Sequence, residues 1–226
     1  TGAAQGLGKE MAKSMMAEGA EVYISDINKD LLDKTVKELS CFGISLDVTK
    51  SEDWENAIDH IKEKSGSLNI LVNNAGIGNG GDIESTDMET WKLVHNVNLD
   101  SVFLGCKYAL PLMRDSGNGS IINISSMSGI VASHNTSAYN SSKAAVRHLS
   151  KSIALHCAKS TNLVRCNSIH PVFTRTAMVQ SMIDAAPERN IEQKLIQQIP
   201  IRKLAEPIDI ANAAIFLASD ESSFIT

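Results

Sequence analysis

The sequence lacks the features that mark several large classes of protein. It holds no run of roughly 18 apolar residues, the length that a membrane-spanning helix needs. No basic stripe is present either, since 21 Lys and Arg against 26 Asp and Glu leave a net charge of −5. A surface that neutralises nucleic-acid phosphates needs the opposite balance. We therefore expect neither a membrane protein nor a nucleic-acid partner, and no signal peptide is visible.

Cysteine is also scarce, and its spacing indicates no special chemistry. The four cysteines form no C-x-x-C pair and no zinc-like cluster; they are Cys41, Cys106, Cys157 and Cys166. We expect buried free thiols, as in a reducing cytosol, and hence a cytoplasmic protein. No spacing of His, Cys or Asp indicates a metal site, so none is predicted.

What the sequence does contain is a regular alternation of strand-like and helix-like segments. The expected strands cover 21–26, 43–48, 68–76, 119–126 and 164–171. The expected helices cover 7–20, 29–39, 51–66, 88–117 (one helix or two), 138–158, 176–186, 188–198 and 207–218. Near-continuous apolar strands separated by helices are typical of a parallel sheet covered on both faces. The predicted fold is a doubly wound α/β sheet of Rossmann type.

The whole chain, residues 1–226, is predicted to be one domain, because it shows no internal repeat, low-complexity tract or linker. It opens directly on a glycine-rich turn and stops at SSFIT (222–226) without a closing element. We expect from this that both ends are trimmed, with a first and a last strand outside the sequence.

In such a fold ligands bind beyond the carboxyl ends of the strands, so the residues there are candidates for a site. The turn TGAAQGLG (1–8) places Gly2, Gly6 and Gly8 before a helix. Glycine lets the backbone approach a pyrophosphate, and the helix N-terminus favours an anion. The spacing is G-x-x-x-G-x-G rather than G-x-G-x-x-G, and a plain strand-to-helix turn is the alternative.

Acids and amides follow the next three strands. Asp26 is placed to accept hydrogen bonds from ribose hydroxyls and to repel a 2′-phosphate. Lys29 is the nearest cation, so the pattern favours NAD over NADP. Asp47, in LDV (46–48), is a candidate acceptor for the adenine amino group, with a loop or cap role as the alternative. NNAG (73–76) offers two amides and two small residues that leave room for a flat ligand.

Tyr139 and Lys143, in SAYNSSKAAV (137–146), lie four residues apart and share a helix face. An ammonium near a phenol stabilises the phenolate and lowers the tyrosine pKa from about 10. A pKa closer to neutrality suits the general acid–base step of carbonyl reduction. Alone, Y-x-x-x-K is a weak motif, and a surface position is the alternative. Its place thirteen residues after Ser126 and behind a dinucleotide-type turn favours catalysis.

In this order the motifs resemble the short-chain dehydrogenase/reductase family over essentially the whole chain. The matching elements are TGAAQGLG, Asp26, LDV, NNAG, Asn98 in HNVNLDSVF, NISSMSG, YNSSK and HPVFTRT. Each is weak alone, whereas their shared order and spacing are highly specific. The resemblance implies a Rossmann-type domain that transfers hydride between a nicotinamide and an alcohol or carbonyl carbon.

The resemblance implies four catalytic residues. Tyr139 would exchange a proton with the substrate oxygen, and Lys143 would lower its pKa and hold the nicotinamide ribose. Ser126 would orient the substrate oxygen; it is preferred to Ser125 because the family's serine usually lies thirteen residues before the tyrosine. Asn98 would interrupt its helix and hold a water that links Lys143 to solvent.

The resemblance also implies the contacts to the cofactor. Besides the glycines, Tyr139 and Lys143, the expected residues are Gln5, Leu7, Asp26, Asp47, Val48, Asn74, Ala75, Gly76, Pro171, Thr174 and Thr176. Thr176 would contact the nicotinamide carboxamide. The family usually has Pro-Gly where this chain has Pro171-Val172. This departure puts the local backbone path in question, not the fold.

The substrate side is expected in the loop between Ser126 and Tyr139 and in a small helical lid over 173–199. The predicted substrate residues are Ser126, Met127, His134, Phe173 and Met178, with Val131 and Met182 as further apolar wall. Met178 and Met182 fit the core of an amphipathic helix equally well. The other histidines are expected to pack or to lie on the surface; they are His60, His95, His148, His156 and His170.

The predicted function is NAD-dependent interconversion of a secondary alcohol and its ketone, the substrate being a small apolar molecule, cyclic or steroid-like. An NADPH-dependent 3-oxoacyl-carrier-protein reductase is an alternative, against which Asp26 speaks. A dinucleotide-sensing protein without catalysis is another, against which Tyr139 and Lys143 speak. Following the family, we expect a homotetramer formed through the helices around 98–115 and 139–158.

Overall fold

The computed structural model describes residues 1–78, 80–160, 164–185 and 187–226. In this part of the chain the strands form two parallel sheets. One sheet pairs β1 (Tyr23–Asp26) with β2 (Phe42–Ser45), and the other has the order β3 (Ile70–Asn73), β4 (Gly119–Ile124), β5 (Val164–Ile169). Every strand pair is parallel, as the sequence predicts.

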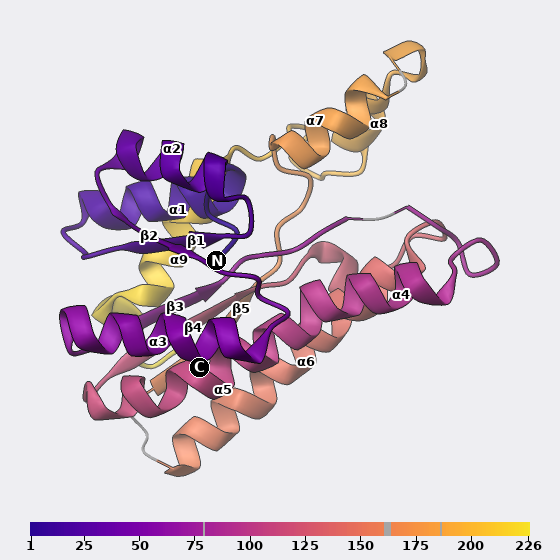
Figure 1. The fold of residues 1–226 in the computed structure, drawn as a ribbon. Coiled ribbons are helices and arrows are strands. Elements are labelled where there is room, and N and C mark those ends of the chain that lie inside the picture. Colours follow the sequence, from indigo (N-terminus) through magenta and orange to yellow (C-terminus); the bar gives the residue numbers. More distant parts are fainter. Residues whose placement is uncertain (79, 161–163, 186) are drawn as a thin grey trace.

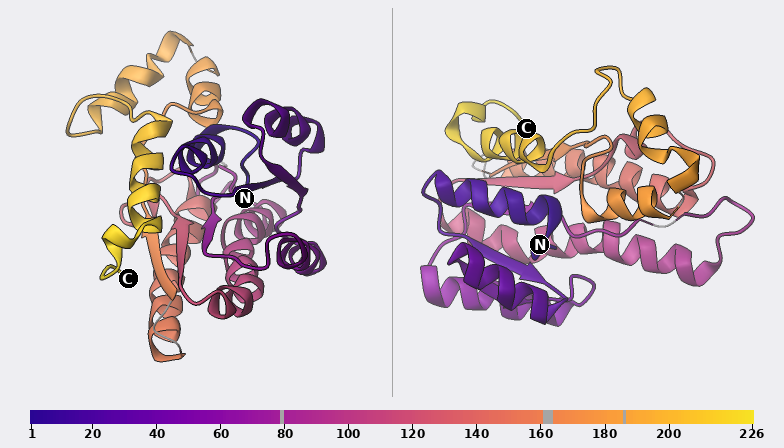
Figure 2. Two further views of the ribbon diagram at one scale, coloured as in Figure 1. Left: turned by 90° about the vertical axis from the view of Figure 1, so that its left-hand side faces the viewer. Right: turned by 90° about the horizontal axis from the view of Figure 1, so that it is seen from above.

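Helices cover both sides of the strands. They are α1 (Gly6–Ala17), α2 (Lys29–Leu39), α3 (Ser51–Ser65), α4 (Met88–His95), α5 (Ser101–Asp115), α6 (Ser137–Ser160), α7 (Ala177–Asp184), α8 (Ile191–Gln197) and α9 (Pro207–Ala218). Figures 1 and 2 show α1, α2 and α9 on one side of the strands and α3, α5 and α6 on the other. This is the doubly wound arrangement that the alternation of strands and helices predicts.

The apolar run in β4 follows from burial on both faces. Ile121 packs in the cluster formed with α3, α5 and α6, whereas Ile122 packs in the cluster formed with α1 and α9. Both side chains are fully buried. A strand buried on both faces has no polar face to alternate with, and burial of each such side chain contributes about 2 kcal/mol.

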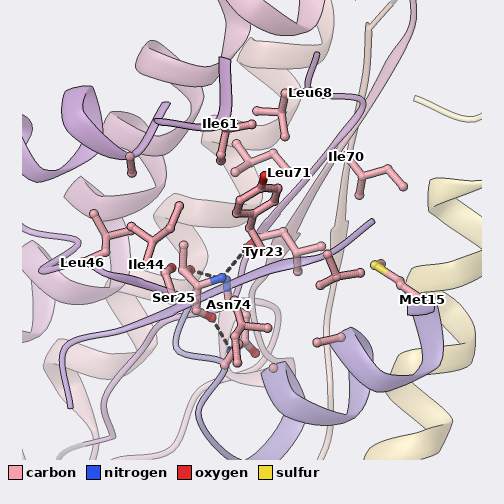
Figure 3. Close-up of a pocket in the computed structure, with 18 of the residues that line it drawn as sticks. Met15, Tyr23, Ser25, Ile44, Leu46, Ile61, Leu68, Ile70, Leu71 and Asn74 are labelled. Atoms are coloured by element: carbon pink, nitrogen blue, oxygen red, sulfur yellow. Dashed lines mark hydrogen bonds between the residues drawn. The ribbon is translucent and has the colours of Figure 1, made fainter. Parts of the chain in front are cut away.

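A cavity of about 150 Å³ separates the two sheets, between β1 and β3 (Figure 3). Its lining is mainly apolar and includes Met15, Ile44, Ile70 and Leu71. At the carboxyl ends the sheets are joined through the glycine turn, because Ala3 N–H donates to the Ser25 carbonyl at 3.0 Å and Asn74 Nδ2 donates to the Gly2 carbonyl at 3.0 Å. The predicted single sheet is thus present in direction and order, but not in unbroken pairing.

The observed elements are mostly shorter than predicted. β1 ends where predicted, at Asp26, whereas the other four strands end two or three residues before the predicted position. The predicted segment 88–117 is two helices joined by a π-helical turn, η1 (Asn96–Asp100). The predicted helix over 176–186 becomes α7, and position 186 lies outside the described residues.

Helices α7 and α8 form a small unit of their own, beside the carboxyl ends of the strands (Figure 1). They pack around an apolar cluster of Val179, Leu195, Ile199 and Leu204. The unit occupies the place in the chain where the sequence predicts a lid. Among the helices that the structure describes, none combines the length and apolarity needed to cross a bilayer.

Candidate functional site

The glycine turn lies where the two sheets meet. Gly2 has a φ of +58°, and a Cβ at this position would meet Ala75 Cα at 2.8 Å. A Cβ on Gly8 would meet the Gly2 carbonyl oxygen at 2.6 Å. Both residues must therefore be glycine for the turn to pack against the segment after β3. The amide of Asn74 completes this contact by donating to the carbonyls of Thr1 and Gly2, at 2.9 and 3.0 Å.

Gly6 differs from the other two glycines because its α-carbon faces open space. Its φ is +60°, and no atom lies within 4 Å of the place where a Cβ would stand. Helix α1 starts here without an acid in its first turn, and within the described chain the Gln5 side chain caps none of its N–H groups. These N–H groups are available to an anion such as a pyrophosphate. The turn thus fits a dinucleotide, with Leu7 packing inward against the α1–α9 cluster.

Asp26 stands beside this turn at the end of β1. Its Oδ2 accepts from Ala4 N–H at 3.1 Å and its Oδ1 from Asn28 N–H at 3.0 Å. The two bonds hold the carboxylate at the edge of the candidate cofactor site and leave each oxygen a further acceptor position. The geometry is the one expected of a ribose-binding acid, and that role remains a prediction.

Asp47 makes the local contacts of a loop residue. Its Oδ1 accepts from the N–H and the hydroxyl of Thr49, at 3.0 and 2.7 Å, and Lys50 lies 3.6 Å from its Oδ2. Burial acts against the charge, but the bonds from Thr49 hold the pKa of Asp47 below its usual value. The loop role weighed for Asp47 is present, while the contacts of Asp47 and its neighbour Val48 with adenine stay predictions.

Two adjacent serines after β4 have different partners. The Ser125 hydroxyl is buried and donates to the Lys143 carbonyl at 2.8 Å, which ties this segment to α6. The Ser126 hydroxyl instead lies beside that of Tyr139. There it acts to lower the pKa of the tyrosine, whereas burial raises that pKa. Ser126 is therefore the serine that shares a site with Tyr139, as the spacing of thirteen residues predicts.

Lys143 is buried next to Tyr139. Its Nζ donates to the Ile124 carbonyl at 2.9 Å and lies 5.8 Å from the centre of the Tyr139 ring. A Cβ on Gly76 would stand 3.3 Å from this Nζ and 3.2 Å from Asn98 Oδ1. The absence of a side chain at Gly76 is therefore what lets the NNAG segment pass over Lys143.

Asn98 is fully buried in η1, the interruption expected from the resemblance. Its Oδ1 accepts from Ile77 N–H at 2.8 Å, and its Nδ2 donates to the Ile77 carbonyl at 3.0 Å and to Ser142 Oγ at 3.1 Å. The amide thus fixes the loop after Gly76 and links it to α6. Its predicted water relay remains untested.

Comparison with known proteins identifies the family. A family model described as enoyl-(acyl carrier protein) reductase matches residues 2–226. The 2,5-dichloro-2,5-cyclohexadiene-1,4-diol dehydrogenase LinX of Sphingobium indicum is 42% identical over 231 residues, which cover 100% of this chain and 90% of that protein. The 3-alpha-(or 20-beta)-hydroxysteroid dehydrogenase of Mycobacterium tuberculosis is 39% identical over 228 residues, covering 100% and 83%. The chain belongs to the short-chain dehydrogenase/reductase family.

Solved structures agree with this short-chain dehydrogenase/reductase assignment. The ligand-free aldohexose dehydrogenase of Thermoplasma acidophilum superposes with a TM-score of 0.91 at 35% identity, covering 100% of this chain and 87% of that one. The similar proteins are oxidoreductases that act on CH–OH groups. The NADP-dependent (R)-specific alcohol dehydrogenase of Lentilactobacillus kefiri is 37% identical over 231 residues, covering 100% of this chain and 90% of that protein.

One expectation for this short-chain dehydrogenase/reductase is wrong as stated. The i, i+4 spacing predicts that Lys143 lowers the pKa of Tyr139. In the structure, burial raises the pKa of Tyr139, and only the neighbouring Ser126 hydroxyl acts in the other direction. Burial also lowers the pKa of Lys143 from 10.5 to about 8. Lys143 does not lower the pKa of Tyr139 because its Nζ is directed at the Ile124 carbonyl rather than at the phenol oxygen.

The residues after β5 are held by local contacts. Thr174 is buried and its hydroxyl donates to the Val172 carbonyl at 2.9 Å. Thr176 Oγ1 accepts from Val179 N–H at 3.4 Å and so caps α7. Val172, which replaces the family's usual glycine, packs its side chain against the apolar cluster of α7 and α8. This contact accounts for the extra side chain at 172, and the cofactor roles of Pro171, Thr174 and Thr176 stay predictions.

The predicted substrate residues are spread around the same end of the sheet. Met127 is about one-third exposed in the turn after Ser126, and a Cβ on Gly78 would stand 3.2 Å from Met178 Sδ. His134 is exposed. Phe173 packs against the cluster of α7 and α8 instead of standing free. Met127 and Met178 are thus partly exposed, whereas Phe173 contributes to the apolar core of the α7–α8 unit.

Two residues that sequence reasoning missed complete the site. Ser142 is fully buried, accepts from Asn98 and donates to the Tyr139 carbonyl at 2.8 Å. His170 approaches the Ser126 carbonyl with its Nδ1 at 3.1 Å. The signal for Ser142 was its place inside YNSSK, next to Lys143. Local sequence gave no signal for His170, because its partner is 44 residues away.

Lys143→Met tests the burial of this lysine without an activity assay. Since the folded-state pKa is about 8 and the ordinary value 10.5, the unfolded chain holds more protons between these values. Stability due to Lys143 therefore rises with pH in this window, by up to about 1.4 kcal/mol per unit. The free energy of unfolding of wild type should therefore rise relative to that of Lys143→Met as the pH increases from about 8 to 10. Urea unfolding measures this, with exposed Lys151→Met as control, and a pH-independent difference would contradict it.

Proposed function

We propose that this chain is an NAD-dependent dehydrogenase that interconverts a secondary alcohol and its ketone, and that its substrates are apolar and cyclic. The observation that carries the proposal is the convergence of Ser126, Tyr139 and Lys143 beside the glycine turn. A hydroxyl, a phenol and an ammonium at one end of a doubly wound sheet supply proton transfer and orientation next to a dinucleotide.

The residues of the chain would manage the proton and the position of the substrate. A bound nicotinamide supplies the hydride acceptor for alcohol oxidation and the donor for ketone reduction. Tyr139 takes the alcohol proton in one direction and returns it in the other. Ser126 holds the substrate oxygen beside Tyr139. Lys143, as an ammonium below its pKa of about 8, places a positive charge near the site where a phenolate forms.

The preference for NAD rests on Asp26. Its carboxylate is fixed by two backbone N–H groups beside the open face of Gly6. An acid in this place accepts hydrogen bonds from ribose hydroxyls and repels a 2′-phosphate. One relative is named as NADP-dependent, so the preference of this chain for NAD is part of the proposal.

The substrate class rests on two exposed methionines and on the relatives. Met127 follows Ser126 directly and Met178 lies against Gly78, and their flexible apolar side chains are 37% and 44% exposed. Flexible thioether side chains suit apolar ligands of varied shape. The relatives named for a cyclohexadiene diol and a hydroxysteroid act on ring alcohols, which supports the same class here.

We expect the enzyme to be a homotetramer. Large apolar side chains are exposed on the helices predicted to form the interface, with Phe103 on α5 at 52% and Leu155 on α6 at 73%. Leu93 on α4 is 54% exposed. Burial of such side chains between subunits would stabilise an oligomer.

The proposal is tested by following absorbance at 340 nm with NAD and NADP in parallel. Cyclohexanol, cyclopentanol and a 3-hydroxysteroid serve as ring alcohols, and 2-propanol as the small acyclic comparison. We expect NADH formation with the ring alcohols and little NADPH formation. Preference for NADP would contradict the role of Asp26. No turnover of any alcohol by enzyme that binds NADH would contradict the proposed reaction.

A further inference from the structure

The catalytic serine segment is anchored to the segment after β5 by three consecutive contacts. Ser125 N–H donates to the Ile169 carbonyl at 2.8 Å, and Met127 N–H donates to the Pro171 carbonyl at 3.0 Å. Between these two parallel-type bonds, the His170 ring reaches across with Nδ1 at 3.1 Å from the Ser126 carbonyl. The contact extends the β4–β5 pairing by a side chain at the point where regular pairing has ended.

The chemistry of the partners requires a hydrogen on one nitrogen of the imidazole. A carbonyl oxygen only accepts, so Nδ1 must carry the hydrogen that binds Ser126. Nε2 lies 2.9 Å from Ser168 Oγ, and in the neutral ring it accepts the serine proton. His170 is thus half-buried with both ring nitrogens in hydrogen bonds, and the Ser126 carbonyl requires the hydrogen on Nδ1.

The backbone that His170 holds determines where the Ser126 hydroxyl points. Ser126 is extended, with φ −164° and ψ 160°. Its carbonyl also accepts from Gly129 N–H at 2.9 Å, and its Oγ accepts from Ser128 N–H at 3.1 Å. The Ser126 hydroxyl therefore remains able to donate its own hydrogen toward Tyr139. A turn of the 126–127 peptide would break the histidine contact and redirect the hydroxyl.

We propose that His170 is a positioning residue for this reaction, which holds the Ser126 backbone so that its hydroxyl faces the substrate oxygen beside Tyr139. The inference rests on the proposed function, since it matters only if Ser126 orients a substrate. It gives His170 no contact with substrate or cofactor. Its effect is therefore expected in kcat and to depend on the presence of the Ser126 hydroxyl.

The test is a double-mutant cycle between His170→Leu and Ser126→Ala, with kcat and the Kd of NADH as readouts. His170→Leu should lower kcat about 10-fold, the size of one lost neutral hydrogen bond. His170→Asn, whose amide can replace Nδ1 as donor, should stay within about threefold of wild type. In the Ser126→Ala background, His170→Leu should change kcat by less than about twofold. The Kd of NADH should not move.

Controls separate positioning from packing and from the proposed function. His148→Leu removes an exposed histidine on α6 and should be silent. An equal loss from His170→Leu with and without the Ser126 hydroxyl would show that His170 acts by packing, and would overturn the inference while the proposed function stands. So would wild-type kcat in His170→Leu. Full activity in Ser126→Ala would overturn the proposed role of Ser126 itself. If His170→Leu fails to fold, failure of His170→Asn to retain kcat overturns the inference.

Discussion

Replacing Tyr139 with phenylalanine should lower kcat for alcohol oxidation about 1000-fold while the Kd of NADH stays within about twofold. The substitution removes one oxygen from a half-buried ring that packs beside Lys143 and Ser126. General acid–base catalysis by a positioned side chain is worth about 100- to 10,000-fold, and the Tyr139 hydroxyl is proposed to be the proton acceptor. The ring itself remains, so the walls of the cofactor site should be intact.

The matched control is Tyr108→Phe on α5, which removes the same hydroxyl from a tyrosine packed against the core away from Ser126. Its kcat should equal that of wild type. Stopped-flow measurement of the hydride step, with NADH binding followed by fluorescence, distinguishes lost chemistry from lost binding. Wild-type turnover by Tyr139→Phe would exclude Tyr139 as the acid–base.

The pH dependence of the reaction follows from the same group. Alcohol oxidation needs Tyr139 without its proton, and burial raises its pKa above the usual value. The rate of oxidation should therefore increase with pH through the alkaline range. A pH–rate profile of kcat measures this rise, and a kcat that stays constant across the alkaline range would exclude Tyr139 as the titrating group.

The fold was predictable because its strongest signals are local. The continuous apolar run of β4 required burial on both faces, and Ile121 and Ile122 are indeed buried on opposite sides. The choice of Ser126 over Ser125 followed from the spacing usual in the family that the chain resembles, and in the structure the Ser126 hydroxyl is the one beside Tyr139. Where helix or strand periodicity persists over several residues, sequence pattern is enough to place an element.

The sequence could not show which of several possible hydrogen-bond partners a side chain takes when those partners come from distant parts of the chain. The spacing of Tyr139 and Lys143 was read correctly, but the direction of the tyrosine pKa was not, because the Ile124 carbonyl takes the ammonium. The contacts of Asp47 with Thr49 show the loop role that was weighed for it, and they leave its contact with a cofactor a prediction. His170 looked like packing because its partner comes from another strand end. Each of these depends on long-range geometry that no local motif records.

Asp26→Ser should change the ratio of kcat/KM for NAD to that for NADP by about 100-fold in favour of NADP. Repulsion between a carboxylate and a 2′-phosphate costs several kcal/mol of binding free energy. Removing about 3 kcal/mol of this repulsion changes the ratio about 100-fold. Serine removes the charge and leaves a hydroxyl. It cannot accept from both Ala4 and Asn28 as the carboxylate does, so a modest decrease in thermal stability should accompany the change.

A control variant shows whether the cofactor preference depends on the charge at position 26 or on the net charge of the protein. Asp33→Ser, at an exposed position on α2, alters the net charge by the same amount and should leave the ratio unchanged. Steady-state rates at about 0.1 M and 0.5 M salt add a second criterion, since screening should shrink the wild-type preference but not that of Asp26→Ser. An unchanged ratio in Asp26→Ser would place the discrimination elsewhere.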